Sequence, residues 1–174
     1  VLFTVVESGS GLAQTLSWVM GNVGDAEIAG SPERNSQGGS IMANAETKTE
    51  GAYKAGDGAY VFDVDKLQGL DAGPGYAETF GPVVEGELTQ VGIMTLPAGQ
   101  TSAPHTHPNE QWIYLLQGSL HATVDGQESD VGPGQLIYIP ANTVHSVTIS
   151  PDEDCHFFTC KDLRSGIAGT PVGG

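Results

Sequence analysis

From residue 58 onward, apolar and polar residues alternate along the chain in short runs, the period of a β-strand with one buried face. Turn-forming sequences such as DGQ, GPG, PAN and SPDED separate the runs. No helical period is sustained after residue 82. Short strands at this spacing predict an all-β sandwich, jelly roll or barrel. The predicted strands lie in AYVFDVDKL (59–67), GELTQVGIMTLPAG (86–99), QWIYLLQG (111–118), SLHATVDGQ (119–127), ESDVGPG (128–134), QLIYIPAN (135–142), VHSVTISP (144–151) and CHFFTCKD (155–162).

The first forty residues do not share this β-pattern. Residues 30–40, GSPERNSQGGS, have the composition of a linker, and Met42 begins a polar stretch typical of a bacterial N-terminus. We therefore predict that residues 1–41 are an extension outside the folded domain, flexible or not native to the protein. The alternative is a short helix at 11–20 that packs on the domain or on a neighbouring subunit. The remaining predicted parts are an N-terminal arm with the first strands at 42–79, a β-barrel at 80–165 and a C-terminal tail at 166–174.

The charge balance excludes several classes of partner. The chain has 21 Asp and Glu against 6 Lys and Arg, for a net charge of −15. Such a polyanion repels nucleic acid and anionic lipid surfaces, so we expect neither as a partner. No run approaches the roughly 20 apolar residues of a membrane span, and no basic region precedes the apolar opening segment as in a signal peptide.

Cysteine usage favours a reducing compartment. Cys155 and Cys160 are five residues apart in one predicted strand, which places them on opposite faces, so we expect free thiols and not a disulfide. Free thiols are typical of reducing compartments, and we therefore expect a cytoplasmic protein.

The segment HTHPNEQWIYLLQG, residues 105–118, carries the candidate chemistry. Residues two apart in a strand share a face, so His105 and His107 point the same way, and Gln111 has the same parity. The flanking Pro104 and Pro108 cannot donate to a sheet ladder, so we place the pair at a strand end or edge.

A third histidine, His145, follows a PAN turn that could return it to the first strand. Three imidazoles and one amide oxygen are a plausible set of ligands for a divalent metal, with positions left for water or substrate. A single His-x-His pair is weak evidence on its own.

The wider spacing around these residues resembles the two motifs of the cupin superfamily. Gly99 precedes His105, His107 and Gln111, and Gly118 follows them, as in the first motif. The resemblance covers roughly residues 80 to 160, and its second motif lies in Gly134, Pro140, Asn142 and His145. It implies a single cupin-type jelly-roll β-barrel, which would follow the irregular N-terminal extension predicted above. It also implies one divalent metal ion (Fe, Mn, Ni, Zn or Co) inside the barrel, held by His105, His107, Gln111 and His145.

Two positions depart from the usual cupin pattern. Cupins most often have Glu where this chain has Gln111, and Glu110 falls on the opposite face by parity, so we expect Gln111 to be the ligand and Glu110 an outer residue. Asn142 stands where the motif usually has Gly, a replacement that a left-handed turn tolerates.

The neutral Gln111 limits the chemistry that we expect. With three neutral imidazoles it leaves the full charge of a divalent ion, which strengthens the ion as a Lewis acid and favours an anionic oxygen ligand. A three-His-one-amide set is similar to that of some cupin lyases and isomerases, whereas three His and one Glu are more usual in dioxygenases. We therefore predict a metal-dependent lyase or isomerase that acts on a small oxygen-bearing molecule. The alternatives are a cupin dioxygenase that uses Fe(II) and a cupin that binds a small ligand without turnover.

Less specific expectations concern the rest of the pocket and the assembly. No Lys or Arg lies between Lys66 and Lys161, so we expect a substrate that is neutral or chelates the metal. Tyr138, Trp112 and Tyr114 are candidate pocket residues, although strand aromatics more often pack in a core or interface. His121 and His156 match neither motif and are expected to be ordinary strand histidines. A homodimer with two-fold symmetry is the default assembly.

Overall fold

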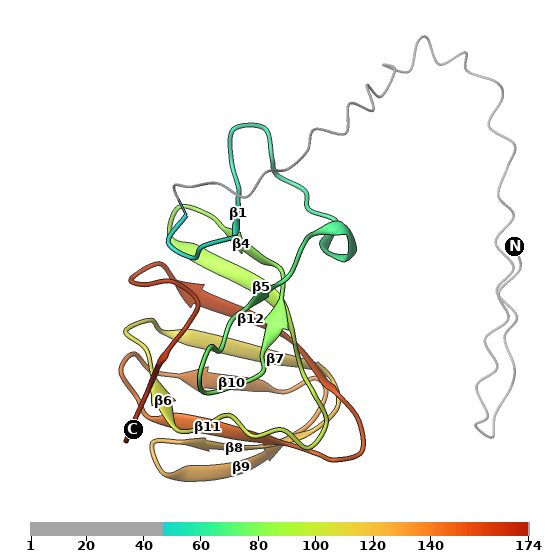
Figure 1. Ribbon diagram of the computed structural model, residues 1–174, viewed down its shortest axis with the longest axis vertical. Helices are drawn as coiled ribbons and strands as arrows, with labels where there is room; N and C mark the ends of the chain where they lie inside the picture. The colour runs from blue at the N-terminus through green and yellow to red at the C-terminus, as the bar shows by residue number, and fades with distance from the viewer. Residues whose placement is uncertain (1–46, 174) are drawn as a thin grey trace, which may run out of the picture. The chain divides into compact units, whose positions relative to one another are not determined.

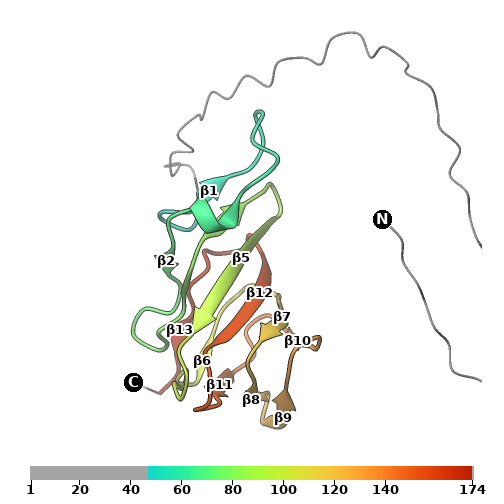
Figure 2. The ribbon, with the colours of Figure 1, turned by 90° about the vertical axis from the view of Figure 1, so that its right-hand side faces the viewer.

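Two β-sheets packed face to face make up residues 47–173, the part of the chain that the computed structural model describes (Figures 1 and 2). Strand pairing is antiparallel except between β1 and β4. The larger sheet has the order β1 (Tyr53–Lys54), β4 (Val83–Glu85), β5 (Thr89–Leu96), β12 (Cys155–Asp162), β7 (Gln111–Gln117) and β10 (Leu136–Ile139), with β2 (Leu70–Asp71) and β3 (Phe80–Gly81) at one side. The smaller sheet has the order β13 (Thr170–Pro171), β6 (His105–Thr106), β11 (His145–Ile149), β8 (Leu120–Val124) and β9 (Gln127–Val131). The prediction of an all-β fold is confirmed.

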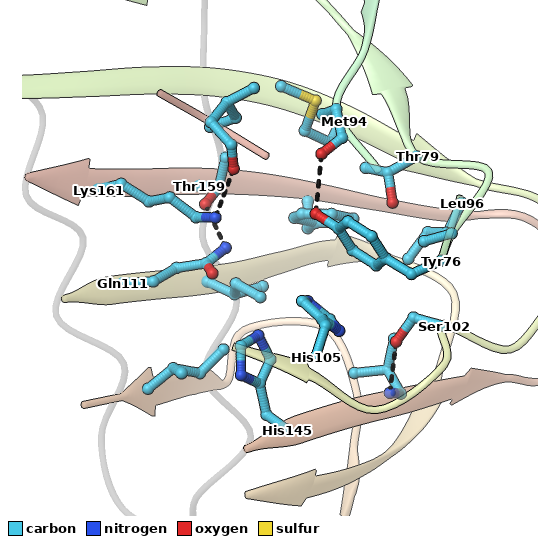
Figure 3. Close-up of a pocket in the computed structure, with 17 residues that line it drawn as sticks. Tyr76, Thr79, Met94, Leu96, Ser102, His105, Gln111, His145, Thr159 and Lys161 are labelled. Carbon is cyan, nitrogen blue, oxygen red and sulfur yellow. Dashed lines mark hydrogen bonds between the residues drawn. The ribbon is translucent and has the colours of Figure 1, made fainter. Parts of the chain in front are cut away.

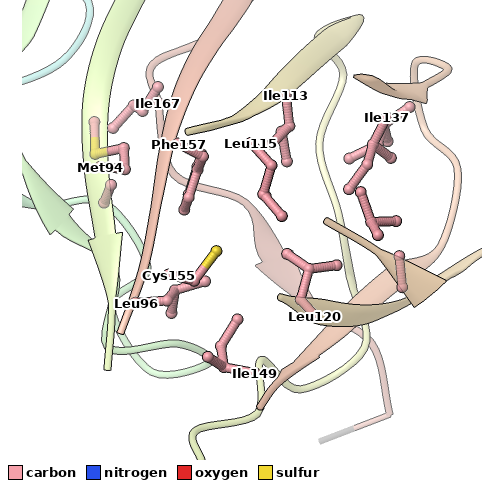
Figure 4. Packing of buried hydrophobic residues seen from close by; sticks show 14 of the residues in the cluster. Met94, Leu96, Ile113, Leu115, Leu120, Ile137, Ile149, Cys155, Phe157 and Ile167 are labelled. Atoms are coloured by element: carbon pink, nitrogen blue, oxygen red, sulfur yellow. The ribbon is translucent and has the colours of Figure 1, made fainter. Parts of the chain in front are cut away.

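The core lies between the two sheets, where the inward residues of each strand meet (Figure 4). Strand β12 shows how the alternating sequence produces this layer, because Cys155, Phe157, Thr159 and Lys161 are buried and the residues between them are partly exposed. Large buried members of the core are Met94, Leu96, Ile113, Leu115, Leu120, Ile137, Ile139, Ile149, Phe157 and Ile167. Removing this apolar surface from water is the main favourable term in forming the barrel.

Every run predicted as a strand after residue 85 contains one, but the run at 59–67 does not. Residues Val64–Lys66 form a short 3-10 helix, η1, and Tyr60 and Val61 are 77% and 90% exposed. The apolar residues there alternate without a sheet to bury them, so the predicted strand was wrong.

The segment at 166–174, predicted as a tail, packs on the barrel as far as residue 171. Ile167 is buried in the core, and β13 pairs with β6 beside His105. Gly169 allows this approach, because a Cβ there would lie 2.8 Å from Cδ2 of His105. The predictions for residues 1–41 lie outside the described residues.

Both cysteines are free thiols, as expected, with Cys155 buried and Cys160 partly exposed. Burial raises the pKa of the Cys155 thiol to about 11. Within residues 47–173, no helix is long and apolar enough to cross a membrane.

Candidate metal centre

The four predicted metal ligands come together at one end of the barrel interior. His105 begins β6, His107 follows that strand directly, and His145 begins β11, where it pairs with His105. Gln111 begins β7 on the opposite sheet. All four side chains are buried, at 8% exposure or less. The strands therefore bring together residues that are up to 40 positions apart, as the motif spacing predicts.

Each histidine is anchored through Nδ1, which leaves Nε2 free to act as a ligand. A backbone carbonyl can only accept a hydrogen bond, so each Nδ1 carries the ring proton and each Nε2 has a bare lone pair. Such second-sphere bonds fix both the tautomer and the orientation of metal-binding imidazoles. The bonds join Nδ1 of His105 to the carbonyl of Ala103 (2.8 Å), that of His107 to Asn109 (2.8 Å) and that of His145 to Thr143 (2.9 Å).

All three imidazoles are neutral at physiological pH. Burial, together with the nearby Lys161, lowers the pKa of His107 to about 4. Burial also lowers the pKa of His145 to about 3 and that of His105 below its usual value. Because only neutral imidazole binds a metal, protons compete poorly for these three nitrogens near neutrality.

The side chains of Gln111 and His107 make a close contact that is unfavourable for these two groups alone. Oε1 of Gln111 lies 2.8 Å from Nε2 of His107, and the amide nitrogen of Gln111 donates to Oγ1 of Thr159 at 2.8 Å. Since the ring proton is on Nδ1, two acceptor atoms face each other at this short distance. Two cis ligands of one metal ion, each about 2.1 Å from it, stand roughly 3 Å apart. The contact therefore has the spacing of two ligand atoms that share an ion.

Two of the three pairs of histidine rings have the spacing of imidazoles on one metal ion, and the third pair is closer. The ring centroids are 4.1 Å apart for His105 and His145, 4.8 Å for His107 and His145, and 6.3 Å for His105 and His107. Two imidazoles on one ion have centroids roughly 4.5 to 6.5 Å apart. As the side chains stand, residues 47–173 contain no group of three or more His, Cys, Asp or Glu that could hold a metal. A metal held by these residues would need His105 and His145 slightly further apart, with the Gln111 oxygen as the fourth candidate ligand.

A cavity of about 70 Å³ adjoins three of the four candidate ligands, His105, Gln111 and His145 (Figure 3). Apolar side chains from both sheets form most of its wall, and no Asp or Glu of the described residues lines it. The residues that line it are Ala72, Tyr76, Ala77, Thr79, Met94, Leu96, Ser102, His105, Gln111, Ile113, Ile139, His145, Val147, Phe157, Thr159, Lys161 and Ile167.

Lys161 is a cavity residue that the sequence analysis missed. It is the last inward-facing residue of β12 and is 4% exposed. Its Nζ donates a hydrogen bond to the carbonyl of Ile167 at 2.6 Å. Burial lowers the pKa of Lys161 to about 7. The sequence has no Lys or Arg between Lys66 and Lys161, and Lys161 itself points inward. Its parity with Cys155 and Thr159 indicates an inward position, but a charged residue is not expected at such a position.

Tyr76 is the second cavity residue that the pattern did not indicate. Its ring stacks on His105 with centroids 4.1 Å apart, and burial raises the pKa of its hydroxyl. That hydroxyl accepts from the Gly169 N–H at 2.8 Å and donates to the Ala72 carbonyl at 3.0 Å. Tyr76 lies between strands, where no periodic pattern marks buried positions.

The three aromatic residues predicted for the pocket lie outside it. Trp112, Tyr114 and Tyr138 are 43%, 38% and 43% exposed, on the outward faces of β7 and β10. Trp112 and Tyr138 contact each other with ring centroids 4.6 Å apart. Their parity is opposite to that of Gln111 and Ile139, so they could not share the cavity. We correct this prediction accordingly.

The other residues that the sequence singled out lie where expected. Glu110 is exposed and accepts a hydrogen bond from the Tyr138 hydroxyl at 3.2 Å. His121 is exposed beside Asp130, and Nδ1 of His156 contacts the hydroxyl of Thr95 at 2.9 Å. Asn142 has a φ of 61°, the left-handed turn conformation that its place in the motif requires.

The sequence matches known proteins over this same region. Residues 92–160 match the family described as Cupin domain, which agrees with the resemblance of the sequence to the cupin superfamily. Members of this superfamily typically bind a metal. The quercetin 2,3-dioxygenase of Bacillus subtilis (strain 168) is 36% identical over 62 residues, which are 35% of this chain and 17% of that protein's length. The match therefore covers only a small part of the relative.

Solved structures share the fold at low sequence identity. The polyketide cyclase RemF from Streptomyces resistomycificus is 21% identical with a TM-score of 0.57, over 66% of this chain and 86% of that one. KdgF from a Halomonas species is 20% identical with a TM-score of 0.52, over 60% of this chain and 94% of that one. At this level of identity the two structures support the fold alone.

Proposed function

We propose that this protein is a metal-dependent enzyme that acts on a small oxygen-bearing molecule, as a lyase or isomerase. The observation that carries the proposal is the set of four ligand atoms beside one small cavity, namely three bare imidazole nitrogens and the Gln111 oxygen. His105, His107, Gln111 and His145 would hold the ion. A divalent ion there supplies Lewis acidity that polarises a substrate oxygen.

The chain's own residues set the conditions for that chemistry. The backbone bonds at Nδ1 hold the imidazoles, and the Thr159 hydroxyl holds the Gln111 amide. Apolar walls such as Met94 and Phe157 exclude bulk water, which strengthens the electrostatic interactions inside. The neutral Gln111 adds no negative charge. These features support chemistry that stabilises an anionic oxygen without a change of oxidation state.

A dioxygenase that uses Fe(II) is the second candidate. It is supported by the local similarity to quercetin 2,3-dioxygenase. The cavity argues against a large aromatic substrate, because it measures about 70 Å³ and pockets for drug-sized ligands measure about 300 to 1,000 Å³.

The two candidates separate by their need for oxygen. We would load the metal-free protein with Zn(II) or Fe(II) and incubate each form with small hydroxy and oxo compounds, with and without oxygen, following products by NMR. Turnover by the Zn(II) form without oxygen supports the lyase or isomerase. Turnover that requires both Fe(II) and oxygen identifies the dioxygenase instead. Saturable binding without turnover in any form means a binding protein and contradicts an enzymatic role. His105→Ala is the control without a complete ligand set.

A further inference from the structure

Lys161 places an amine in a cavity that offers it no negative charge. Its side chain extends from β12 towards the space beside His105, Gln111 and His145 (Figure 3). Neither an Asp nor a Glu of residues 47–173 lines that space, and no ion pair to Lys161 is formed there. An ammonium has three N–H donors, and the structure gives Nζ one acceptor, the carbonyl of Ile167. A buried charge without an opposite charge is strongly unfavourable, which is why burial lowers the pKa of Lys161 to about 7. An anionic ligand beside Nζ would supply the missing opposite charge and favour the ammonium form.

A network of buried hydrogen bonds holds the Lys161 side chain in place. The carbonyl that accepts from Nζ belongs to Ile167, whose N–H donates to Oγ1 of Thr49 at 2.8 Å. Gln90 accepts from the same Thr49 hydroxyl at 2.7 Å and donates to the carbonyl of Ser165 at 2.9 Å. These buried bonds fix residues 165–167, and through Ile167 they fix the direction of Nζ. An amine positioned in this way loses little conformational entropy when it binds a ligand.

From these contacts we infer that the cavity binds a small carboxylate, with the carboxylate on Lys161 and a second oxygen towards the three histidines. The volume of about 70 Å³ has room for roughly five water-sized groups, which suits an acid of two or three carbons. The apolar wall, with Leu96, Ile139 and Phe157, faces the carbon atoms of such a ligand. The placement of the second oxygen rests on the proposed function, which puts a metal ion at the three histidines. The inference also changes the expected substrate from a neutral molecule to an anionic one.

The test measures binding of lactate and of lactamide, its uncharged counterpart, by isothermal titration calorimetry. The protein is used both loaded with Zn(II) and free of metal, with metal content measured in each preparation. The variants are Lys161→Met, which keeps the chain length and removes the charge, and Lys161→Gln, which covers a failure of the first to fold. Lys66→Met is the matched control, because it makes the same change in net charge at an exposed lysine whose ion-pair partner among the described residues is Asp63.

We expect both Lys161 variants to weaken lactate binding by at least about tenfold. Lys66→Met should leave it unchanged, and lactamide should bind more weakly than lactate to the wild type. Three results overturn the inference: lactate binding that is unaffected by the Lys161 variants, lactamide binding equal to lactate binding, or no lactate binding to either form up to about 50 mM.

The same data distinguish this inference from the proposed function. A protein that takes up no Zn(II) but binds lactate through Lys161 contradicts the proposed function and keeps the carboxylate site. A protein that takes up Zn(II) and binds lactate independently of Lys161 keeps the metal site and overturns the inference.

Discussion

Nε2 of His107 lies 2.8 Å from Oε1 of Gln111, although both atoms are acceptors once Nδ1 of His107 donates to the carbonyl of Asn109. Two arrangements relieve this contact. A cation can lie beside both atoms, or the amide can turn over, so that its nitrogen donates to His107 and its oxygen accepts from the Thr159 hydroxyl. Metal loading therefore selects one of two amide orientations, and Thr159 contacts Gln111 in both.

Thr159→Val tests this positioning of Gln111. Valine keeps the shape of threonine and removes the hydroxyl that holds the amide, so we expect metal affinity to fall by roughly 10- to 100-fold, as for other second-sphere bonds. Thr159→Ser should restore most of the affinity. Metal affinity is measured by competition with a chromophoric chelator. Thr95→Val, which removes a hydroxyl that contacts His156 on the adjacent strand, is the control. Equal affinities for Thr159→Val and wild type would show that the hydroxyl does not position the ligand.

Gln111→Glu tests the importance of a neutral ligand. A carboxylate there should hold the metal at least as tightly, but it brings a negative charge into a cavity that has none. We therefore expect affinity for a small carboxylate, and any turnover, to fall by at least about tenfold. Gln127→Glu makes the same change in charge at an exposed position of β9 and should have no effect. Unchanged or increased turnover in Gln111→Glu would contradict the argument from ligand charge.

The buried histidines should make the metal-free protein sensitive to acid. Burial lowers the pKa of His107 to about 4 and that of His145 to about 3, whereas both titrate near 6.5 in the unfolded chain. Between the folded and unfolded pKa values the unfolded chain therefore binds more protons than the folded protein. The contribution of the two histidines to the free energy of unfolding is complete above about pH 6.5 and is lost as the pH falls towards their pKa values in the folded protein. Each histidine contributes at most about 1.4 kcal/mol per pH unit to that slope.

Urea unfolding in the presence of a chelator, between about pH 7.5 and 5, measures this dependence. His107→Gln should flatten the slope. His121→Gln should not, because Asp130 raises the pKa of this exposed histidine. A slope that is the same in His107→Gln and wild type would show that His107 is not held neutral by the fold.

The aromatic residues of the outer face should be dispensable for the centre. Trp112→Ser and Tyr138→Ser remove side chains that point away from the cavity, so we expect metal affinity to stay within about twofold of wild type. Tyr76→Leu removes the ring that stacks on His105 and should weaken metal binding. A larger effect from Trp112→Ser than from Tyr76→Leu would show that the site had been assigned to the wrong face of the sheet.

The longer strands, and the coming together of the four candidate ligands, could be predicted from sequence because both depend on regular spacing. Alternation defined β5 and β7 to β12, and the motif spacing indicated that His105, His107 and Gln111 come together. Their shared parity was not the reason, because Gln111 lies on the sheet opposite His105. The remaining strands are two or three residues long, too short to show a period. Alternation also misled at 59–67, where Val61 has no sheet to pack against.

The cavity was harder to predict than its ligands, because its other polar residues do not follow a spacing rule. Lys161 occupies an inward position that a strand pattern assigns to an apolar residue. Tyr76 reaches the site from an irregular segment between β2 and β3. Their roles follow from tertiary contacts with Ile167 and His105, which alternation within a single strand does not encode.

Metal content of the purified protein tests the central claim most directly. After growth in medium supplemented with divalent metals, the wild type should contain about one equivalent of a transition metal per chain. His105→Ala and His145→Ala should lose most of it while circular dichroism shows that the β-fold remains, and His121→Ala, an exposed histidine change, should retain it. A wild-type content below about 0.2 equivalents, or full retention in the His105 and His145 variants, would contradict the assignment of the centre.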